Sequence, residues 1–458
     1  MQKIIIKNFG PVQSAEIELK KVLVLIGEQA SGKSTISRLI YFFKTLRQDL
    51  VYQIYKNESE LFNYQDHLVL LIKEKFHHFF GLSLHKTSFN IRFYYSIEKN
   101  KYINVSLDEH NKLKVIVSNI FLNDDFSEKL NDLIPQINYL EANDDGILTA
   151  KYLDNIFKLI NQLFEDKIRY SLFVIAGRNV TVNYSDLFEK YLFAHVQSKI
   201  EQNEKQSLTE KSQTIEETLM LRFIQEIETI KRFFKKFEGF EGIIENYVTD
   251  NKKKKKLSFF KDKAAKILKG KYNIDNSGEK LILNERESVY LSNASSGQQE
   301  VIRILQDIFI LIVSDSKALR IIEEPEAHLF PVAQKNLIEL LAYMVNHDED
   351  NQLIITTHSP YILAVFNNLL FANRVVEKNV AAEKEVNGII EKEFWLSAND
   401  FSAYSLGNQS FGEDAAYCEP IFDTETGMIE QNYLDDVSEI LGEDFQALMN
   451  IHAKTFAR

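Results

Sequence analysis

Three short motifs place side chains suited to phosphate and metal chemistry at separate points along the 458-residue chain. The first, Gly27 to Ser34, fits the pattern Gly-x-x-x-x-Gly-Lys-Ser, in which glycines let backbone N–H groups face the phosphates of a nucleotide. In that pattern Lys33 contacts the β- and γ-phosphates and Ser34 holds Mg²⁺. The residues predicted to bind ATP here are Gly27, Gln29, Ala30, Ser31, Gly32, Lys33, Ser34 and Thr35.

The sequence around this loop predicts the elements that hold it. An apolar run over residues 21–26 indicates a buried strand entering the loop, and residues 34–43 have the spacing of a helix leaving it. A strand, a glycine-rich loop and a helix in this order are the setting that the motif requires.

The second motif is Ser295, Ser296, Gly297 and Gln298, which we call the signature. It follows a strand-like stretch, residues 288–291, and precedes a long helical pattern, residues 299–312. The start of a helix offers free N–H groups and a positive dipole end to an anion. The alternative is an ordinary serine cap at the start of a helix.

The third motif supplies carboxylates. Residues 319–324 form an apolar run that ends in Glu323 and Glu324, and the carboxyl edge of an open α/β sheet is where ligands bind. We expect Glu323 to support Mg²⁺ and Glu324 to orient and deprotonate the attacking water. A further strand-like run, residues 352–357, leads to His358, which either contacts the γ-phosphate or is structural.

With these motifs in this order, the chain resembles the SMC-like ABC ATPases with a head of the OLD and RecF type. The block from Glu323 to Pro331 and the sequence Thr-Thr-His-Ser-Pro over residues 356–360 carry the resemblance together with the loop and the signature. Within that group the chain looks most like the stand-alone ATPase subunits of bacterial anti-phage systems of the PARIS and Septu types.

The resemblance implies a head-to-head dimer that encloses two ATP molecules. Each ATP is held by the phosphate loop of one protomer and by the signature serine, here Ser296, of the other. It also implies that Glu324 is the catalytic base and His358 the switch histidine. The chain departs from the family pattern at Ser296-Gly297, where Gly-Gly is usual, and at Glu323, where Asp is commoner. The longer Glu323 side chain favours a water-mediated metal contact and slow turnover.

A strand-like run over residues 171–176 ends in Gly177-Arg178-Asn179. Arg178 has two interpretations: it faces the γ-phosphate or the dimer partner, because a guanidinium binds phosphate through two bonds, or it is a surface or core-pairing arginine at a turn. Either Gln136 or Asn179 is a candidate for the amide of the Q-loop, the segment through which ABC heads contact the nucleotide.

The predicted fold class is α/β: an ABC-type P-loop head, with a mixed sheet flanked by helices and an inserted helical arm. We predict an N-terminal lobe over residues 1–182, a helical arm ending in a lysine-rich segment over 183–270, and a C-terminal lobe over 271–458. The chain is 45% hydrophobic and therefore can bury a large core. It has no apolar run long enough to cross a membrane, so we expect a cytoplasmic protein without membrane contact.

Lysines are concentrated at one point of this acidic chain, whose net charge is −12. Residues 252–271 hold ten lysines and one acid, beginning with Lys252, Lys253, Lys254, Lys255 and Lys256. The functional interpretation is a sequence-independent site for DNA, RNA or an acidic partner, and the alternative is a solvated helix face.

The leading hypothesis is an ATPase, with ATP and Mg²⁺ as cofactors, that acts as a sensor and scaffold in anti-phage defence and controls an effector protein, a nuclease encoded nearby. The alternative is a RecF-like repair ATPase that binds DNA directly. The single cysteine, Cys418, excludes a disulfide within one chain. The acidic stretch Asp423 to Gly427 is read as a turn between strands in preference to a metal loop.

Overall fold

A computed structural model describes residues 1–56, 64–81, 88–108, 110, 112–121, 126, 128–133, 146–183, 215–407, 416–430 and 442–452. Its centre is a six-stranded sheet with the order β14-β13-β3-β12-β11-β7. Five of these strands are parallel and only β14 runs antiparallel to its neighbour. The strands are β3 (Val22–Gly27), β7 (Tyr170–Val174), β11 (Ala318–Glu323), β12 (Gln352–Thr357), β13 (Phe401–Leu406) and β14 (Cys418–Pro420).

Because five strands run the same way, their carboxyl ends meet at one edge of the sheet. The phosphate loop follows β3, the acidic pair Glu323–Glu324 lies at the end of β11 and His358 follows β12, so these three groups meet at that edge. Strands β3, β11, β12 and β13 are buried over almost their whole length, as expected for strands of a sheet covered on both faces.

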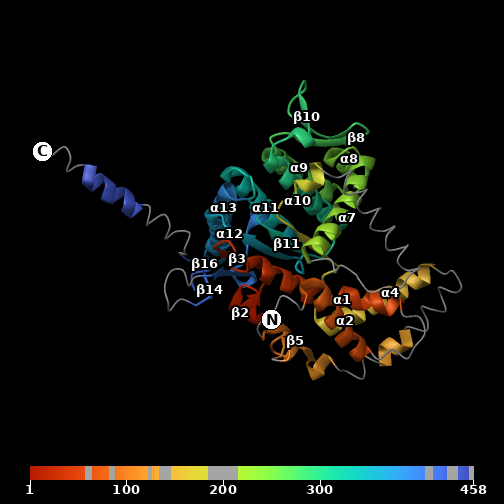
Figure 1. The fold of residues 1–458 in the computed structure, drawn as a ribbon. Helices are drawn as coiled ribbons and strands as arrows, with labels where there is room; N and C mark the ends of the chain where they lie inside the picture. The colour runs from red at the N-terminus through yellow and green to blue at the C-terminus, as the bar shows by residue number, and fades with distance from the viewer. Residues whose placement is uncertain are drawn as a thin grey trace.

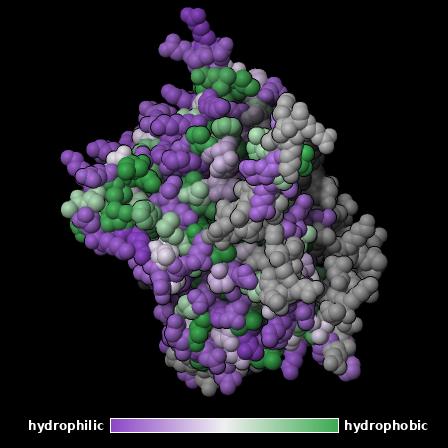
Figure 2. Space-filling model, turned by 90° about the vertical axis from the view of Figure 1, so that its left-hand side faces the viewer, coloured by the Kyte–Doolittle hydropathy of each residue, from purple (hydrophilic) through white to green (hydrophobic). Residues whose placement is uncertain are grey.

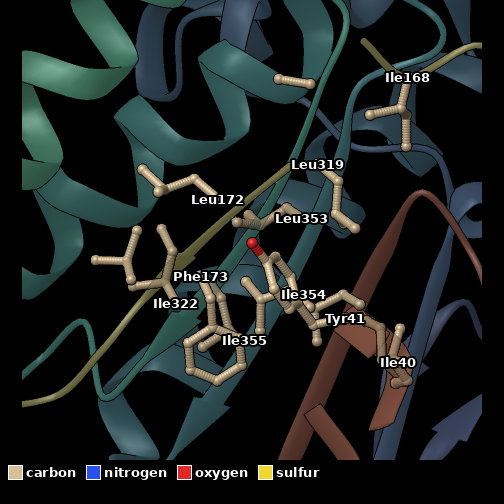
Figure 3. Close-up of a cluster of buried hydrophobic side chains, with 14 of the residues drawn as sticks. Ile40, Tyr41, Ile168, Leu172, Phe173, Leu319, Ile322, Leu353, Ile354 and Ile355 are labelled. Atoms are coloured by element: carbon tan, nitrogen blue, oxygen red, sulfur yellow. The ribbon is translucent and has the colours of Figure 1, made fainter. Parts of the chain in front are cut away.

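Helices cover both faces of this sheet (Figure 1). They include α1 (Lys33–Lys56), α10 (Ser296–Ser314), α11 (Pro331–His347) and α12 (Pro360–Lys378). Figure 3 shows Ile40 and Tyr41 of α1 beside Phe173 of β7 and Ile354 of β12. All four are buried, and the rings of Tyr41 and Phe173 meet edge to face.

A second sheet contains five strands in the order β2-β1-β4-β5-β6, all antiparallel. It is formed by β1 (Gln2–Phe9), β2 (Val12–Leu19), β4 (Asn90–Ser96), β5 (Lys101–Leu107) and β6 (Leu113–Val117). Helices α2 (Tyr64–Phe80) and α4 (Gly146–Phe164) accompany it, and η1 is Asn119–Phe121. A cluster of phenylalanine rings, including Phe9, Phe42 and Phe76, joins this sheet to α1 and α2.

The described helices of the segment predicted as an arm pack onto the head. They are α7 (Ile215–Lys236), α8 (Phe240–Asn246) and α9 (Asn251–Leu268). Phe309 of α10 contacts one ring from each: Phe234, Phe240 and Phe260. Figure 1 shows this layer against α10, below the sheet of β8 (Lys271–Asp275), β9 (Gly278–Ile282) and β10 (Ser288–Tyr290). These helices therefore share the core of the head.

The remaining elements are short. They are α5 (Val180–Asn183), η2 (Leu291–Asn293), η3 (Val380–Ala382), α13 (Glu383–Ile389), η4 (Lys392–Phe394), η5 (Ala398–Asp400), β15 (Phe422–Asp423) and β16 (Met428–Ile429). The backbone N–H groups of Glu425 and Thr426 donate to the Asp423 carboxylate between β15 and β16, so the acidic stretch is the expected turn.

The side of the molecule in Figure 2 is largely hydrophilic, with small apolar clusters between polar side chains. A search of the described residues finds no helix with the length and apolar character that a membrane span requires. The architecture confirms the predicted α/β class, a mixed sheet flanked by helices with the phosphate loop leaving a central strand.

Candidate nucleotide site

The phosphate loop joins β3 to α1 in a conformation that its glycines permit. Gly27 and Gly32 have φ angles of 153° and 86°, which side chains other than glycine rarely adopt. A Cβ atom at Gly27 would lie 2.4 Å from the Leu406 carbonyl oxygen, which is backbone of β13. Gln29 and Ala30 are exposed at the tip of the loop, while Ser34 and Thr35 are half-buried in the first turn of α1.

Lys33 stands inside the loop. Its Nζ atom donates to the carbonyl oxygens of Gly27 and Glu28, each at 2.7 Å, and lies 3.5 Å from Ser31 Oγ. Burial lowers the pKa of Lys33 to about 8, although the carboxylates of Glu324 and Glu326 act in the opposite direction. The ammonium group is therefore held where an incoming phosphate would replace two carbonyl contacts with stronger anionic ones.

A tyrosine from the C-terminal part of the chain supports the same loop, and the sequence analysis did not identify it. The Tyr417 hydroxyl lies 2.7 Å from the Ser31 carbonyl oxygen and 2.8 Å from that of Pro11. It is also 3.1 Å from the position of a Cβ atom at Gly32, so a larger residue there would displace it. No local pattern marks Tyr417, because its role depends on a contact almost 400 residues away.

The first carboxylate of the acidic pair has the features of a metal ligand. Glu323 is 6% exposed at the end of β11, and its Oε1 atom is buried without a hydrogen-bond partner. A buried anionic oxygen without a donor is costly unless a cation or a water molecule completes it. Together with Ser34, which offers a hydroxyl at the start of α1, Glu323 fits the oxygen ligands that Mg²⁺ prefers.

The second carboxylate is held beside the predicted switch histidine. Glu324 Oε1 lies 3.3 Å from Nε2 of His358, and both side chains are partly exposed. The hydrogen bond with His358 lowers the pKa of Glu324 more than partial burial raises it. Glu324 is therefore ionised at neutral pH, as a group that accepts a proton from water must be.

The backbone at Glu324 is strained. Its φ angle of 44° lies in the left-handed region, which costs a residue other than glycine about 1 to 3 kcal/mol. The Glu324 N–H donates to the Thr356 carbonyl oxygen at 2.9 Å and so fixes the end of β11 to β12. This conformation turns the Glu324 side chain out of the strand direction that Glu323 follows.

Glu326 organises the turn that carries His358. Its Oε1 atom accepts hydrogen bonds from Thr357 Oγ1 at 2.7 Å and from the His358 N–H at 2.8 Å. Its other carboxylate oxygen, Oε2, is buried without a partner. The sequence analysis included Glu326 in the acidic motif but gave it no role, because the contact is made across two neighbouring strands.

The signature forms the start of α10. Ser295 is the N-cap, and Gln298 completes a capping box with it. Ser296 is exposed at the first helical position. Gly297 is buried, and a Cβ atom there would lie 2.4 Å from the His328 carbonyl oxygen, so only glycine fits against the turn after the acidic motif.

Arg178 lies behind the acidic pair and is fully buried. Its Nη1 atom donates to the carbonyl oxygens of Ile175 at 2.9 Å and Glu323 at 2.7 Å, and its Nη2 atom donates to that of Glu324 at 3.1 Å. Nη2 is also 3.2 Å from a carboxylate oxygen of Glu300 in α10. This geometry matches the alternative of a core-pairing arginine at a turn, because the guanidinium contacts three backbone carbonyls and Glu300 within the head.

Of the two Q-loop candidates, Asn179 is half-buried directly after Arg178, and Gln136 lies outside the described residues. The Q-loop assignment therefore stays a prediction.

The lysine run lies at the opposite end of α10 from the signature. Lys253 donates to the Val313 carbonyl oxygen at 2.9 Å and pairs with Asp315 at the end of α10, and Lys254 donates to the Glu245 carbonyl oxygen at 3.2 Å. The other three side chains are exposed: Lys252, Lys255 and Lys256. Since α10 has 19 residues, the run begins roughly 28 Å from the signature.

Comparison with known proteins identifies the class. The chain belongs to the AAA ATPase domain family, whose sequence pattern matches residues 1–363 and so includes the phosphate loop, the signature and the acidic motif. The family is one of nucleotide-binding P-loop ATPases. No curated protein sequence matches the chain significantly.

Solved structures of SMC head domains align with the chain at low identity. One is an SMC head bound to the C-terminal winged-helix domain of ScpA, with 13% identity, a TM-score of 0.36, and coverage of 79% of this chain and 90% of that one. A second is the SMC head domain from Thermotoga maritima, with 11% identity, a TM-score of 0.33, and coverage of 79% and 90%. A third, an SMC head with an extended coiled coil bound to the C-terminal domain of ScpA derived from Pyrococcus furiosus, has 13% identity, a TM-score of 0.34, and coverage of 80% and 92%.

The lowered pKa of Lys33 predicts a pH-dependent affinity for ATP. Bound phosphate favours the ammonium form, whereas the free site loses this proton above its pKa of about 8. Binding should therefore take up a proton at alkaline pH, and affinity should fall by up to roughly tenfold for each pH unit above 8. Calorimetric titration in two buffers of different ionisation enthalpy measures both effects.

The matched variant is Lys33→Arg, whose guanidinium stays protonated throughout this range. If the Lys33→Arg variant binds ATP, binding should not be accompanied by proton uptake. An affinity of the wild type that stays constant from neutral to alkaline pH, with no proton uptake, would contradict the assignment of Lys33 as the buried phosphate ligand.

Proposed function

We propose that this chain is an ATP-hydrolysing switch in which two copies close around two ATP–Mg²⁺ units, and that the closed state controls a separate effector protein. The observation that carries the proposal is the meeting of Lys33, Glu323 and the Glu324–His358 pair at one sheet edge. A phosphate-binding lysine, a metal carboxylate and a basic carboxylate are the groups that hydrolysis of a γ-phosphate requires.

Each residue has a defined part in the proposed reaction. Lys33 leaves its loop carbonyls and binds phosphate oxygens, while Ser34 and Glu323 would hold Mg²⁺, which neutralises charge on the phosphates. Glu324 accepts a proton from the attacking water, and His358 orients Glu324 and then contacts the γ-phosphate. The present hydrogen bond between Glu324 and His358 must open to admit the water, which favours slow turnover.

Dimerisation is supported by the surface beside this edge. Ser296 is exposed at the positive end of α10, free to meet an anion carried by another protomer. Phe330 and Val332, at the start of α11, are 73% and 62% exposed, and Tyr361, at the start of α12, is 54% exposed. The two helix starts adjoin, because Ser359 Oγ lies 2.6 Å from Gln334 Oε1. Exposed apolar side chains gathered beside a ligand site are typical of a protein interface.

On the resemblance to stand-alone defence ATPases, we propose that the controlled effector is a nuclease encoded nearby and that the trigger is a foreign protein or nucleic acid. Such a trigger acts by binding one state of the dimer better than the other. The proposal assigns cleavage of nucleic acid to the effector.

Assembly and turnover should respond to ATP in a defined pattern, which mass photometry and a phosphate-release assay measure. Lys33→Ala should abolish ATP-driven dimers, and Glu324→Gln should lower turnover at least about 100-fold while making the dimer persist. Phe330→Asp should weaken the dimer. The control is Ile389→Asp, which changes a comparably exposed apolar side chain on α13 and should leave the dimer unchanged. A neighbouring nuclease should join the wild-type assembly. ATP-independent mass and turnover in all variants would contradict the switch.

The second candidate function is direct DNA binding by a RecF-like repair ATPase, and the three exposed lysines of α9 favour it. Replacing Lys252, Lys255 and Lys256 by Gln should then weaken DNA binding and reduce the steepness of its salt dependence. The matched control is a triple variant in which three exposed lysines elsewhere in the chain, Lys73, Lys112 and Lys114, are replaced by Gln. Equal DNA binding by both triple variants would exclude a role for the lysine run.

A further inference from the structure

Arg178 connects the acidic pair to the signature helix through a continuous set of buried contacts. On one side its guanidinium donates to the backbone carbonyls of Glu323 at 2.7 Å and Glu324 at 3.1 Å. On the other it is 3.2 Å from the carboxylate of Glu300. Arg178 and Glu300 have 0% and 2% exposed side chains, so no solvent separates the two elements at this point.

The contact acts on a residue of the site whose backbone conformation is constrained. Glu324 is held in a left-handed conformation, with φ of 44°, by its N–H bond to Thr356 and by the bond from Arg178 to its carbonyl oxygen. A strained conformation persists only where its surroundings fix it. A shift of Arg178 therefore changes where the Glu324 carboxylate points.

Glu300 follows Ser296 by four residues, so the two lie one above the other on α10, one helical turn apart. Between them, Gly297 and Gln299 are buried and Gln298 is half-buried, and close-packed interiors transmit a displacement instead of absorbing it. Movement of the first turn of α10 is therefore passed to Glu300.

We propose that Arg178 is a positioning residue that couples the two ATP sites: contact of Ser296 with the nucleotide of the partner protomer moves Glu300, and Arg178 then sets the orientation of Glu324. This inference rests on the proposed dimer. Its consequence is that each protomer hydrolyses its own ATP only when its signature has bound the other ATP. The two sites then hydrolyse ATP together, and turnover depends cooperatively on ATP concentration.

The same helix offers a matched control. Asp307 of α10 forms a buried bidentate pair with Arg320 of β11, at 2.6 and 2.8 Å, without contact to the acidic pair. Glu300→Gln and Asp307→Asn each remove one charge from a buried ion pair of α10. Both should destabilise the head, but only Glu300→Gln changes the connection to Glu324.

The experiment measures ATP affinity, kcat, the Hill coefficient of turnover and the melting temperature for wild type, Glu300→Gln, Arg178→Lys and Asp307→Asn. Glu300→Gln should keep its ATP affinity within about twofold, lower kcat by roughly 10- to 100-fold and bring the Hill coefficient to one. The double variant Glu300→Gln with Arg178→Lys should lose little more kcat than either single variant, because both break one connection. Asp307→Asn should lower the melting temperature but leave kcat and the Hill coefficient unchanged.

Two failures are distinguishable. If the wild type dimerises with ATP and turns over cooperatively, but Glu300→Gln behaves as Asp307→Asn does, the coupling through Arg178 is overturned and the switch stands. If the wild type neither dimerises nor hydrolyses ATP, the proposed function fails and the coupling fails with it.

Discussion

The arrangement of this head depends on α10, whose buried face is fixed by ion pairs as well as by apolar packing. Glu300 pairs with Arg178, Arg303 pairs with Glu279 through two bonds at 2.6 and 2.9 Å, and Asp307 pairs with Arg320. Arg303 holds the pKa of Glu279 at about 2 against the effect of burial. Removing one partner of such a pair costs about 3 to 5 kcal/mol, so a displacement of the helix acts on several buried contacts at once.

This constraint explains how distant parts of the chain form one site. The signature at the start of α10 presses Gly297 against the turn after the acidic motif, and α7, α8 and α9 pack around Phe309 on the same helix. The parallel strands then bring the phosphate loop, the acidic pair and His358 to one edge. Helix α10 is thus fixed both at the signature and at Phe309. A change at the nucleotide site can therefore be transmitted along α10 to helices α7, α8 and α9.

The sequence was informative where function depends on local patterns. The phosphate loop, the apolar strands and the capped start of α10 each need residues within a few positions of one another, and the structure has these elements near the predicted bounds. The α/β class follows from them. The sequence did not reveal Tyr417 at the phosphate loop or Glu300 behind the acidic pair, because these contacts join segments more than 100 residues apart. For Arg178 the sequence left two interpretations open, because the burial and the contacts of its guanidinium depend on β11 and α10 and are not visible in the local sequence.

Burial also changes the interpretation of the charged segments. The lysine run seemed uniform along the sequence, yet Lys253 and Lys254 contact carbonyl and carboxylate oxygens of the head, and Lys263 is buried against Glu339 at 2.6 Å. A helix that packs on the core uses part of its charge internally. Its remaining exposed lysines lie far from the nucleotide edge, so any ligand there would act at a distance from the hydrolytic site.

The central claim is that each active site is built from two copies of the chain, and mixing two inactive variants tests it most directly. Lys33→Ala removes the phosphate ligand, and Ser296→Arg blocks the signature. If each ATP lies between the loop of one protomer and the signature of the other, a mixed dimer contains one site with neither change. Mass photometry with ATP should then detect dimers in the mixture that neither variant forms alone. A mixture that stays monomeric with ATP, under conditions where the wild type dimerises, would show that the site does not combine the loop of one copy with the signature of the other and would contradict the account.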